Sequence, residues 1–481
     1  MLLGLDLGTG SLKALLLSED GQVLGEASRA YAVTAPRPGY AETDPLEWWH
    51  AAGEAVQEAV GERGGEVRSI GLSGQMHGVV LCKPDGMPLR NAVLWADTRS
   101  ALQLDLYRAL SAYERRRLGN PIVTGMAGPT LLWLQSRELL YWNAAWALQP
   151  KDWLRLCLTG RVCAEPSDAS ATLLYDLEGD GWFDDLIDTL GLRRDLLPPL
   201  QPSSAVAGEL SLEAARHLGL RAGTPVATGA GDTAAAMLGS GLIHPGPVQL
   251  SVGSGAQLVA PLDRPKVDLA LRTHLYRGAV PGRWYAMAAM QNAGLALEWV
   301  RKVLGLSWEQ AYEEAFAVPA GAEGLTFLPF LTGERTPHMN PAARGEWAGL
   351  GLHHGRGHLM RSALEGVAFS VREGMEALEA NDVAIPEIRL AGGGTADPRW
   401  RQLLSDVLGR PLLATDVPSA SARGAALLGG MAVGVYAGVN AVAELAPRPV
   451  RVAEPQAGLG LEAAYRRYRE LYKSLKGWFE G

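Results

Sequence analysis

The chain has 481 residues, of which 47% are hydrophobic and 20% are charged, and its formal net charge is −8. This length predicts two or three domains of a globular protein, and the negative charge, with only seven lysines, excludes the basic surface that nucleic-acid binding needs. Three cysteines without a C-x-x-C pair exclude a disulfide framework and favour a reducing cytoplasm, and we expect neither a signal peptide nor a membrane span.

Residues 2–17 predict two short strands joined by a glycine-rich turn, with one carboxylate, Asp6, inside the first strand. The turn and the second strand contribute Gly8, Thr9, Gly10 and Lys13. Turn amides, a hydroxyl and a lysine suit a phosphate, and Asp6 suits the Mg²⁺ that accompanies it. An ordinary hairpin with a hydrogen-bonded aspartate explains the same residues, so this stretch alone leaves both interpretations open.

The next segments alternate between helix and strand, which favours an α/β fold. Asp44 and Pro45 are typical of a helix start, as its cap and its first residue. Residues 69–73 predict a strand that feeds a turn with Met76 and His77 between two glycines. Polar side chains at a strand end suit hydrogen bonds to a polyol. A histidine satisfied within a tight loop is an equally good interpretation.

A second carboxylate follows a predicted strand at residues 225–228 and the turn Gly229-Ala230-Gly231. Asp232 begins a helix, and a role as helix cap explains it fully. The functional alternative is a general base that takes a proton from a substrate hydroxyl. An aspartate is a weak base for an alcohol, but phosphoryl transfer depends mainly on positioning and charge stabilisation.

Glycines and prolines between residues 240 and 247 predict the main domain boundary, which divides the chain into residues 1–243 and 244–481. The second half opens as the first does, with a strand at 248–252, the turn Gly253-Ser254-Gly255 and a strand at 257–260. Two similar openings indicate a duplicated architecture.

Another glycine-rich turn, Gly392-Gly393-Gly394, lies between a predicted strand at 388–390 and a helix at 399–408. It allows close backbone approach to a flat or anionic ligand, although a plain tight turn is the simpler explanation. Ser421 is predicted to cap a helix of small residues. An aromatic stripe over residues 461–475 predicts a closing helix that docks on the core rather than binding RNA.

Three common motifs fail on inspection. Lys13 stands where the third glycine of a dinucleotide fingerprint belongs, and a strand follows it. No Gly-Lys dipeptide occurs, which excludes a Walker A loop. Gln75 stands where the last glycine of G-x-S-x-G belongs, which argues against a serine hydrolase.

In their order along the chain, these weak signals together resemble the FGGY carbohydrate kinases over nearly the whole sequence. The series is Asp6-Leu7-Gly8-Thr9, Gly74-Gln75-Met76-His77-Gly78, Gly229-Ala230-Gly231-Asp232, Gly253-Ser254-Gly255, Gly333-Glu334-Arg335-Thr336-Pro337 and Gly392-Gly393-Gly394. Residues 72–78, 150–155 and 333–338 carry a closer similarity, to the members that act on a ketopentose. One departure is Thr130, where the family pattern has a lysine.

The resemblance implies an α/β, two-domain actin-like ATPase (ribonuclease H-like) fold, with a duplicated mixed sheet and a central cleft for ATP, Mg²⁺ and a sugar. It implies that Asp232 is the base for the terminal sugar hydroxyl and that Asp6 is a catalytic residue that organises Mg²⁺. Met76 and His77, with Asp232, are implied to contact the sugar. The implied nucleotide site consists of Gly8, Thr9, Gly10 and Lys13 from the first domain and Gly253, Ser254, Gly393 and Asp397 from the second.

Several alternatives stay open beside this reading. The substrate can be another ketose or a polyol, because selectivity depends on a few pocket hydrogen bonds. An actin-like ATPase or sugar-binding regulator without transferase activity is disfavoured by Asp232, since a pure binder needs no base in its cleft. A nicotinamide dehydrogenase is disfavoured by Lys13. The expected partners are a small sugar and ATP, with a homodimer left open.

Overall fold

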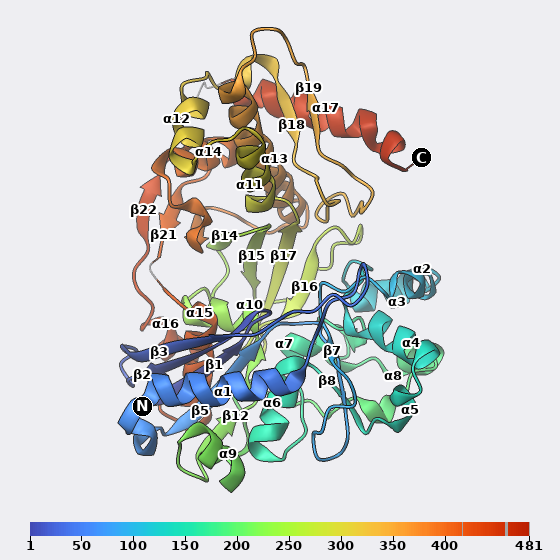
Figure 1. Ribbon diagram of the computed structural model, residues 1–481, viewed down its shortest axis with the longest axis vertical. Coiled ribbons are helices and arrows are strands. Elements are labelled where there is room, and N and C mark those ends of the chain that lie inside the picture. The colour runs from blue at the N-terminus through green and yellow to red at the C-terminus, as the bar shows by residue number, and fades with distance from the viewer. Residues whose placement is uncertain (416, 457–459, 481) are drawn as a thin grey trace.

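The computed structural model describes residues 1–415, 417–456 and 460–480, which form two α/β bodies stacked along the longest axis of the molecule (Figure 1). A seven-stranded sheet lies in the lower body of Figure 1, and a second seven-stranded sheet lies above it in these ranges. This arrangement confirms the predicted α/β fold with two sheet-containing halves.

The first sheet has the strand order β11-β12-β5-β1-β2-β3, with β13 beside β5. Its central strand, β1, pairs antiparallel with β2 and parallel with β5. The strands are β1 (Leu2–Leu7), β2 (Ser11–Leu17), β3 (Val23–Ala30), β5 (Ser69–Gly74), β11 (Val206–Glu209), β12 (Pro225–Ala227) and β13 (Ala230–Gly231).

The second sheet has the strand order β16-β17-β15-β14-β20-β21-β22. From β17 onward it repeats the first sheet read from β3: two antiparallel pairings, two parallel pairings and one antiparallel pairing. The predicted duplication is therefore confirmed. The strands are β14 (Val248–Val252), β15 (Ala256–Leu262), β16 (His274–Arg277), β17 (Trp284–Met290), β20 (Ile388–Ala391), β21 (Leu412–Ala414) and β22 (Val450–Ala453).

Helices cover both faces of β1, which is why its residues are apolar almost without interruption. Leu3, Leu5 and Leu7 pack in one cluster with α1 (Pro45–Val60), which begins as predicted with Asp44 as cap. Alternate residues point to the opposite face, where a Cβ on Gly4 would lie 1.9 Å from a backbone oxygen of α15 (Ala420–Ala432). Only glycine lets that helix approach so closely.

α15 belongs to the second half of the chain but packs on β1 and β5 of the first sheet and on α10 (Asp232–Gly239). Figure 1 shows it in the lower body. The predicted cap, Ser421, lies inside the helix, and its hydroxyl instead donates to the backbone oxygen of Asp232 at 3.1 Å. The cap position is held by Ser419. A helix from the second half thus supports the element that carries the candidate base.

The first half contains further helices besides α1 and α10. They are α2 (Leu104–Arg108), α3 (Ala112–Leu118), α4 (Ala127–Arg137), α5 (Leu140–Asn143), α6 (Pro150–Thr159), α7 (Pro166–Ala169), α8 (Asp184–Thr189) and α9 (Leu212–Leu218). Short strand pairs lie among them: β4 (Glu42–Thr43) with β7 (Ala92–Val93), β6 (Val80–Cys82) with β8 (Trp146–Leu148), and β9 (Tyr175–Asp176) with β10 (Gly181–Trp182).

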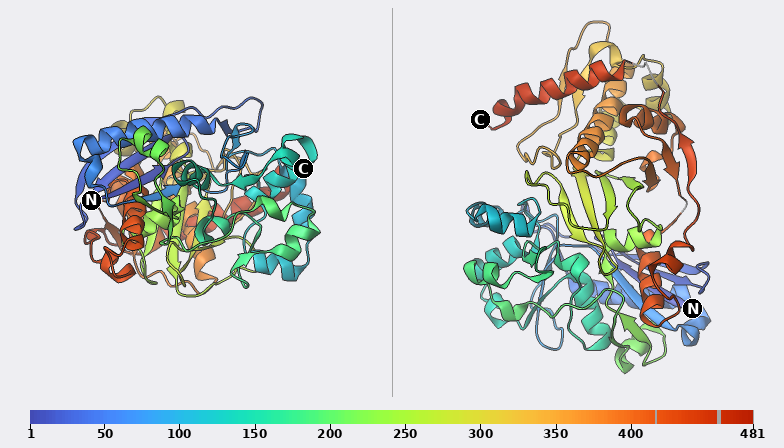
Figure 2. Two further views of the ribbon diagram at one scale, coloured as in Figure 1. Left: turned by 90° about the horizontal axis from the view of Figure 1, so that it is seen from below. Right: turned by 180° about the vertical axis from the view of Figure 1, so that it is seen from behind.

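Within the described residues, most helices of the second half pack on the long helix α13 (Arg356–Glu379), but α16 (Val439–Ala443) lies beside α15 in the lower body of Figure 1. The others are α11 (Gly294–Val303), α12 (Trp308–Phe316), α14 (Pro398–Leu408) and α17 (Leu461–Glu480), and β18 (Thr326–Leu328) pairs with β19 (Glu346–Ala348). Figure 2, seen from behind, shows α17 lying across the upper body. Its Tyr465, Tyr468 and Tyr472 belong to the core there, which confirms the predicted docking helix.

The two halves share a hydrophobic cluster that joins α10 and α15 to the second sheet. Met76 and Ala235 of the first half pack there with Tyr276, Tyr285 and Met287 of the second. The two halves therefore meet in a packed interface. Within the described ranges, no helix has both the length and the apolar character that crossing a membrane requires.

Candidate active site

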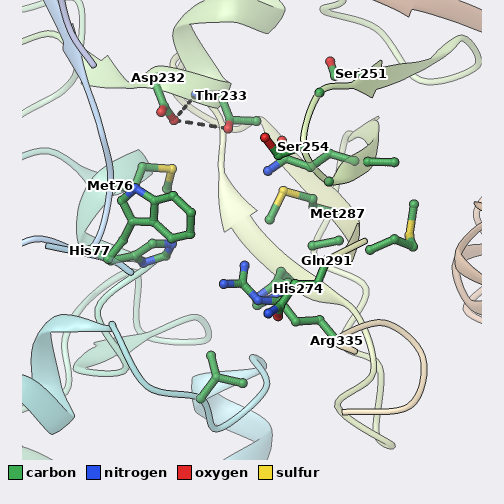
Figure 3. A pocket seen from close by; sticks show the side chains of 18 of the residues that line it. Met76, His77, Asp232, Thr233, Ser251, Ser254, His274, Met287, Gln291 and Arg335 are labelled. Carbon is green, nitrogen blue, oxygen red and sulfur yellow. Dashed lines mark hydrogen bonds between the residues drawn. The ribbon is translucent and has the colours of Figure 1, made fainter. Parts of the chain in front are cut away.

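A cavity of about 470 Å³ lies between the two halves and is lined by residues of both. Figure 3 shows the side chains that face it. The first half contributes Thr9, Met76, His77, Trp95, Val123, Thr124, Met126, Asp232 and Thr233, and the second contributes Ser251, Gly253, Ser254, His274, Tyr276, Met287, Gln291 and Arg335, among others. This is the central cleft that the resemblance implies.

Asp232 is the first residue of α10, and the cap position belongs to Gly231. Its Oδ1 accepts hydrogen bonds from the backbone nitrogen of Thr233 at 2.6 Å and from the Thr233 hydroxyl at 3.2 Å. Burial, and then the negative charge of Asp6, raise the pKa of Asp232 to about 7, against these two hydrogen bonds. A carboxylate with that pKa accepts a proton near neutral pH far more readily than an ordinary aspartate does.

Asp6 sits at the C-terminal end of β1, where the register places it between Lys13 of β2 and Ser73 of β5. The Ser73 hydroxyl donates a hydrogen bond of 2.8 Å to Oδ1 of Asp6. Burial raises the pKa of Asp6, and the Ser73 hydrogen bond and the Lys13 charge oppose that rise. Because Asp6 also raises the pKa of Asp232 through its charge, the two carboxylates act on each other electrostatically.

The turn after β1 is held in place from both sides. The Gly8 oxygen accepts from Gln75 Nε2 at 3.2 Å and from the Tyr31 hydroxyl, and Trp95 Nε1 donates to the Thr9 hydroxyl at 2.9 Å. In the described part of the chain, the amides of Thr9 and Gly10 have no acceptor. Of this turn, Thr9 lines the cavity. Unpaired amides in a rigid turn are what a phosphate needs.

The matching turn of the second half follows β14. Its Gly253 and Ser254 oxygens accept from Gly294 and Leu295, the first residues of α11, at 3.0 and 2.9 Å. A Cβ on Gly394 would lie 2.3 Å from the Val252 oxygen, so the 392–394 turn lies directly against the end of β14. Both glycine-rich turns of the second half therefore come together at this strand end.

Met76 and His77 follow β5 and face the cavity beside Asp232 (Figure 3). His77 Nδ1 lies 2.7 Å from the Ala171 oxygen, and since a carbonyl only accepts, Nδ1 carries the hydrogen. Burial lowers the pKa of His77 to about 4, against the Ala171 hydrogen bond, and the charge of Arg335 lowers it further. The neutral ring thus leaves Nε2 as a hydrogen-bond acceptor for a hydroxyl.

Beneath the site lies a fully buried cluster of charges, which the motif at 150–155 supplies in part. Lys151 Nζ lies 2.7, 3.2 and 2.9 Å from carboxylate oxygens of Asp152, Glu165 and Asp168. Burial alone would lower the pKa of Lys151, but the three carboxylates raise it, while burial raises the pKa of Asp168 well above its usual range. Arg155 joins the cluster through Asp152 at 2.9 Å.

Hydrogen bonds connect this charge cluster to the backbone at two candidate site residues, His77 and Asp232. The side chain of Gln149 donates through Nε2 to the backbone oxygen of Asp168 at 2.8 Å. Its Oε1 accepts from the backbone nitrogen of His77 at 2.9 Å. Ser167, whose hydroxyl donates to Glu165 at 2.9 Å, accepts from the backbone nitrogen of Gly231 at 3.0 Å. The cluster therefore supports the backbone on either side of the cavity.

The structure does not bring every predicted site residue to the cavity. The cavity lining does not include Asp6, Gly8, Gly10, Lys13, Gly393 and Asp397. The first four of these lie near Thr9, at the adjoining ends of β1 and β2. Asp397 caps α14, accepting from the Arg399 backbone nitrogen at 2.8 Å, and pairs with the Arg399 guanidinium at 2.8 Å. A hydrogen-bonding role toward adenosine would compete with those two contacts.

The lining residues that sequence reasoning missed include Trp95, His274, Tyr276, Gln291 and Arg335. Arg335 stands in the motif at residues 333–337, which carries the family resemblance but predicts no role for this residue. The other residues lie in segments where no local sequence pattern predicts a binding site. They reach the cavity only through the pairing of β16 with β17 and through the loop that follows β7.

The residues present fit a Mg²⁺ ion in its usual manner. In the described residues, no group of three or more His, Cys, Asp or Glu side chains could enclose a metal. Mg²⁺ normally keeps several waters and binds one or two carboxylates together with substrate phosphates. Asp6 lies next to the glycine-rich turn after β1, and its charge acts on Asp232, so these two carboxylates could hold Mg²⁺ in that way.

The two duplicated halves with a cavity between them define a two-domain protein of the actin-like ATPase fold. The N-terminal domain of the FGGY family of carbohydrate kinases matches residues 1–239, and its C-terminal domain matches residues 248–433. The chain belongs to the FGGY family of carbohydrate kinases, and it is an ATP-dependent sugar kinase.

The similar proteins point in the same direction. A xylulose kinase of Escherichia coli is 36% identical over 416 residues, covering 86% of each chain. One of Staphylococcus epidermidis is 31% identical over 484 residues, covering 99% of this chain and 97% of the relative. The crystal structure of a xylulose kinase from Rhodospirillum rubrum superposes with a TM-score of 0.92 at 30% identity, covering 100% of both chains.

Proposed function

We propose that this protein transfers the γ-phosphoryl group of ATP to D-xylulose, giving D-xylulose 5-phosphate and ADP. The similarity to xylulose kinases over most of the chain supports the substrate. The observation that carries the chemistry is Asp232, a carboxylate with a pKa near neutrality that faces the cavity between the halves.

In this proposal Asp232 orients the terminal hydroxyl of the sugar and takes its proton late in the transfer. His77 accepts a hydrogen bond from a sugar hydroxyl through Nε2, and Met76 packs against the carbon chain. The transfer is direct and in line, so the protein contributes mainly positioning and charge stabilisation. In this proposal the two halves close on sugar and ATP, which excludes water and limits wasteful hydrolysis of ATP.

The phosphates are proposed to bind between the two strand-end turns, with Gly8, Thr9, Gly10 and Lys13 on one side and Gly253 and Ser254 on the other. Gly393 and Asp397 are proposed to lie near the adenosine. Asp6 is proposed to hold Mg²⁺, which when bound offsets the negative charge of the phosphate oxygens. The domain division at 243/244, with sugar and base on the first domain and nucleotide on the second, is part of the same proposal.

The alternative within the family is a kinase for another ketose, such as ribulose, or for a polyol. The distant alternative is an ATPase or sugar-binding regulator without transferase activity. ADP release measured with a panel of pentuloses, hexuloses and polyols separates these. We expect D-xylulose to give the highest kcat/KM. ATP turnover that no sugar changes would contradict the kinase mechanism.

The base is tested by Asp232→Asn, which keeps the shape of the side chain but removes its basicity. We expect phosphorylation of D-xylulose to fall by at least about 1000-fold while binding of ATP, measured by calorimetry, is retained. Activity near the parent level would remove Asp232 as the base.

The free thiols of Cys82, Cys157 and Cys163 support a cytoplasmic location, and a homodimer stays a prediction.

A further inference from the structure

We infer that Arg335 is the anchor for the end of the sugar that is remote from the transferred phosphoryl group, and that this end of the cavity is built to bind two coplanar oxygens. The ligand class that follows is the five-carbon aldonate, whose carboxylate presents such a pair. This inference rests on the proposed function for the orientation of the sugar.

Arg335 is an unpaired cation in the cavity. In the described part of the chain, its guanidinium makes no hydrogen bond and no ion pair, and it lies over the Trp95 ring, whose centroid is 5.7 Å from the guanidinium carbon. It is the one Lys or Arg among the described lining residues, as Asp232 is the one Asp or Glu. A mostly buried cation without a partner is costly unless a ligand satisfies it.

The backbone on both sides of Arg335 is held in place by hydrogen bonds. Thr336 donates from its backbone nitrogen to the Ala289 oxygen at 3.0 Å, and its hydroxyl accepts from the Ala289 nitrogen at 3.1 Å. Glu334 Oε1 accepts from the backbone nitrogens of Gln291 and of Arg335 itself, the latter at 2.7 Å. Both neighbours of Arg335 are thereby tied to the end of β17.

The surroundings of the guanidinium do not neutralise it. Glu334 turns its carboxyl toward the backbone, and its Oε2 is buried without a partner within the described residues. Burial raises the pKa of Glu334 to about 8, against those two amide hydrogen bonds and the charge of Arg335. The other neighbours, His77, His274 and Tyr276, are uncharged: burial, and then Arg335, lower the pKa of His274 well below its usual value.

Figure 3 shows Arg335 and His274 at one end of the cavity and Asp232 at the other, with Met76 and His77 alongside the space between. A pentulose whose terminal hydroxyl meets Asp232 therefore directs C1 and C2 toward Arg335. These two atoms carry a hydroxyl and a ketone oxygen. The planar guanidinium donates in a fork that matches two neighbouring oxygens in one plane.

A carboxylate matches that fork better than a hydroxyketone does, because it adds a negative charge to the same geometry. D-Xylonate shares C3 to C5 with D-xylulose and carries a carboxylate at C1. Xylitol shares the same three carbons and carries only tetrahedral alcohol carbons at C1 and C2. The pair of ligands therefore differs at the end that Arg335 is inferred to bind.

The experiment measures inhibition of D-xylulose phosphorylation by D-xylonate and by xylitol in the parent and in Arg335→Gln. In the parent we expect D-xylonate to compete with D-xylulose and to bind at least about 10-fold tighter than xylitol, as a charge-assisted pair of hydrogen bonds implies. In Arg335→Gln that preference is expected to vanish while inhibition by xylitol changes little. Arg108→Gln, which removes an exposed guanidinium on α2, is the matched control.

Equal binding of the two ligands by the parent, or an unchanged preference in Arg335→Gln, would overturn the inference. If Arg335 instead contacts a phosphate of ATP, Arg335→Gln raises the KM for ATP and leaves the preference for D-xylonate intact. Direct calorimetric binding of D-xylonate and xylitol without ATP keeps this test separate from the proposed function. If the parent protein does not phosphorylate D-xylulose, that result contradicts the proposed function but leaves the inference about Arg335 to the binding measurements.

Discussion

The backbone nitrogen of Gly231 donates a hydrogen bond of 3.0 Å to the hydroxyl of Ser167, immediately before the proposed base Asp232. The Ser167 hydroxyl in turn donates a hydrogen bond to the carboxylate of Glu165. That carboxylate forms an ion pair of 3.2 Å with the buried Lys151. The start of α10 is therefore anchored to a buried charge cluster in another segment of the chain. This anchoring determines where the Asp232 carboxylate lies.

Replacing Ser167 by alanine is expected to lower kcat by about 3- to 10-fold and the free energy of unfolding by about 1–3 kcal/mol, because the Gly231 nitrogen is left without its acceptor. The measurements are steady-state kinetics and urea unfolding. Ser203→Ala is the matched control: it also removes a hydrogen bond to Glu165, of 2.9 Å, but its hydroxyl does not reach Gly231. A loss of kcat that is equal in both variants would show that Ser167 acts through stability alone.

Asp6→Asn is expected to lower kcat by at least about 10-fold and to raise the Mg²⁺ concentration needed for half-maximal rate, because the amide oxygen is a weaker ligand than a carboxylate. The measurement is a Mg²⁺ titration of the rate at saturating ATP and sugar. Ser73→Ala removes only the 2.8 Å hydrogen bond to Asp6, so its effect should be smaller. An unchanged Mg²⁺ requirement in Asp6→Asn would contradict a metal-organising role.

His77→Ala is expected to raise the KM for D-xylulose by about 2- to 10-fold, the value of one neutral hydrogen bond, and to leave the KM for ATP unchanged. His77 is neutral above its pKa of about 4, so this contribution should not vary between pH 6 and 8. His217→Ala is a suitable control, because His217 stacks on Trp49 outside the cavity. An effect confined to the ATP KM would show that the sugar site has been placed wrongly.

The raised pKa of Asp232 predicts a pH dependence of stability. Folding raises this pKa from the ordinary 3.8 to about 7, so the folded state binds more protons than the unfolded state between those values. The contribution of Asp232 to stability is therefore present at low pH and is lost as the pH rises to about 7. Asp232→Asn should be more stable than the parent at pH 8 and nearly equal at pH 4.

The measurement is the urea midpoint of both proteins at pH 4, 6 and 8 without ligands. The same pKa predicts that kcat/KM for the sugar falls below pH 7, since only the ionised carboxylate can accept a proton. ATP binding measured over the same range is the control for ionisation of the nucleotide. A stability difference between the two proteins that stays constant with pH would contradict the shifted pKa.

The local features of the site were predictable from the sequence because they depend on residues close together in the chain. A strand, a glycine-rich turn and a second strand form a hairpin through their own hydrogen bonds, at β1 and β2 and again at β14 and β15. Asp44 caps its helix two residues on. The Ser421 cap failed because tertiary packing directs that hydroxyl to Asp232 instead.

By itself, the sequence determined the helices, strands and turns, and with them the motif series that marks the FGGY family. Only the tertiary structure decided the electrostatics of the candidate site. The pKa values of Asp232 and His77 depend on burial and on the charges of Asp6 and Arg335, which lie far away in the chain. Desolvation and Coulomb forces act through space, so no local pattern of residues contains them. The tertiary structure also places the guanidinium of Arg335 in the cavity, without a hydrogen-bond or ion-pair partner among the described residues.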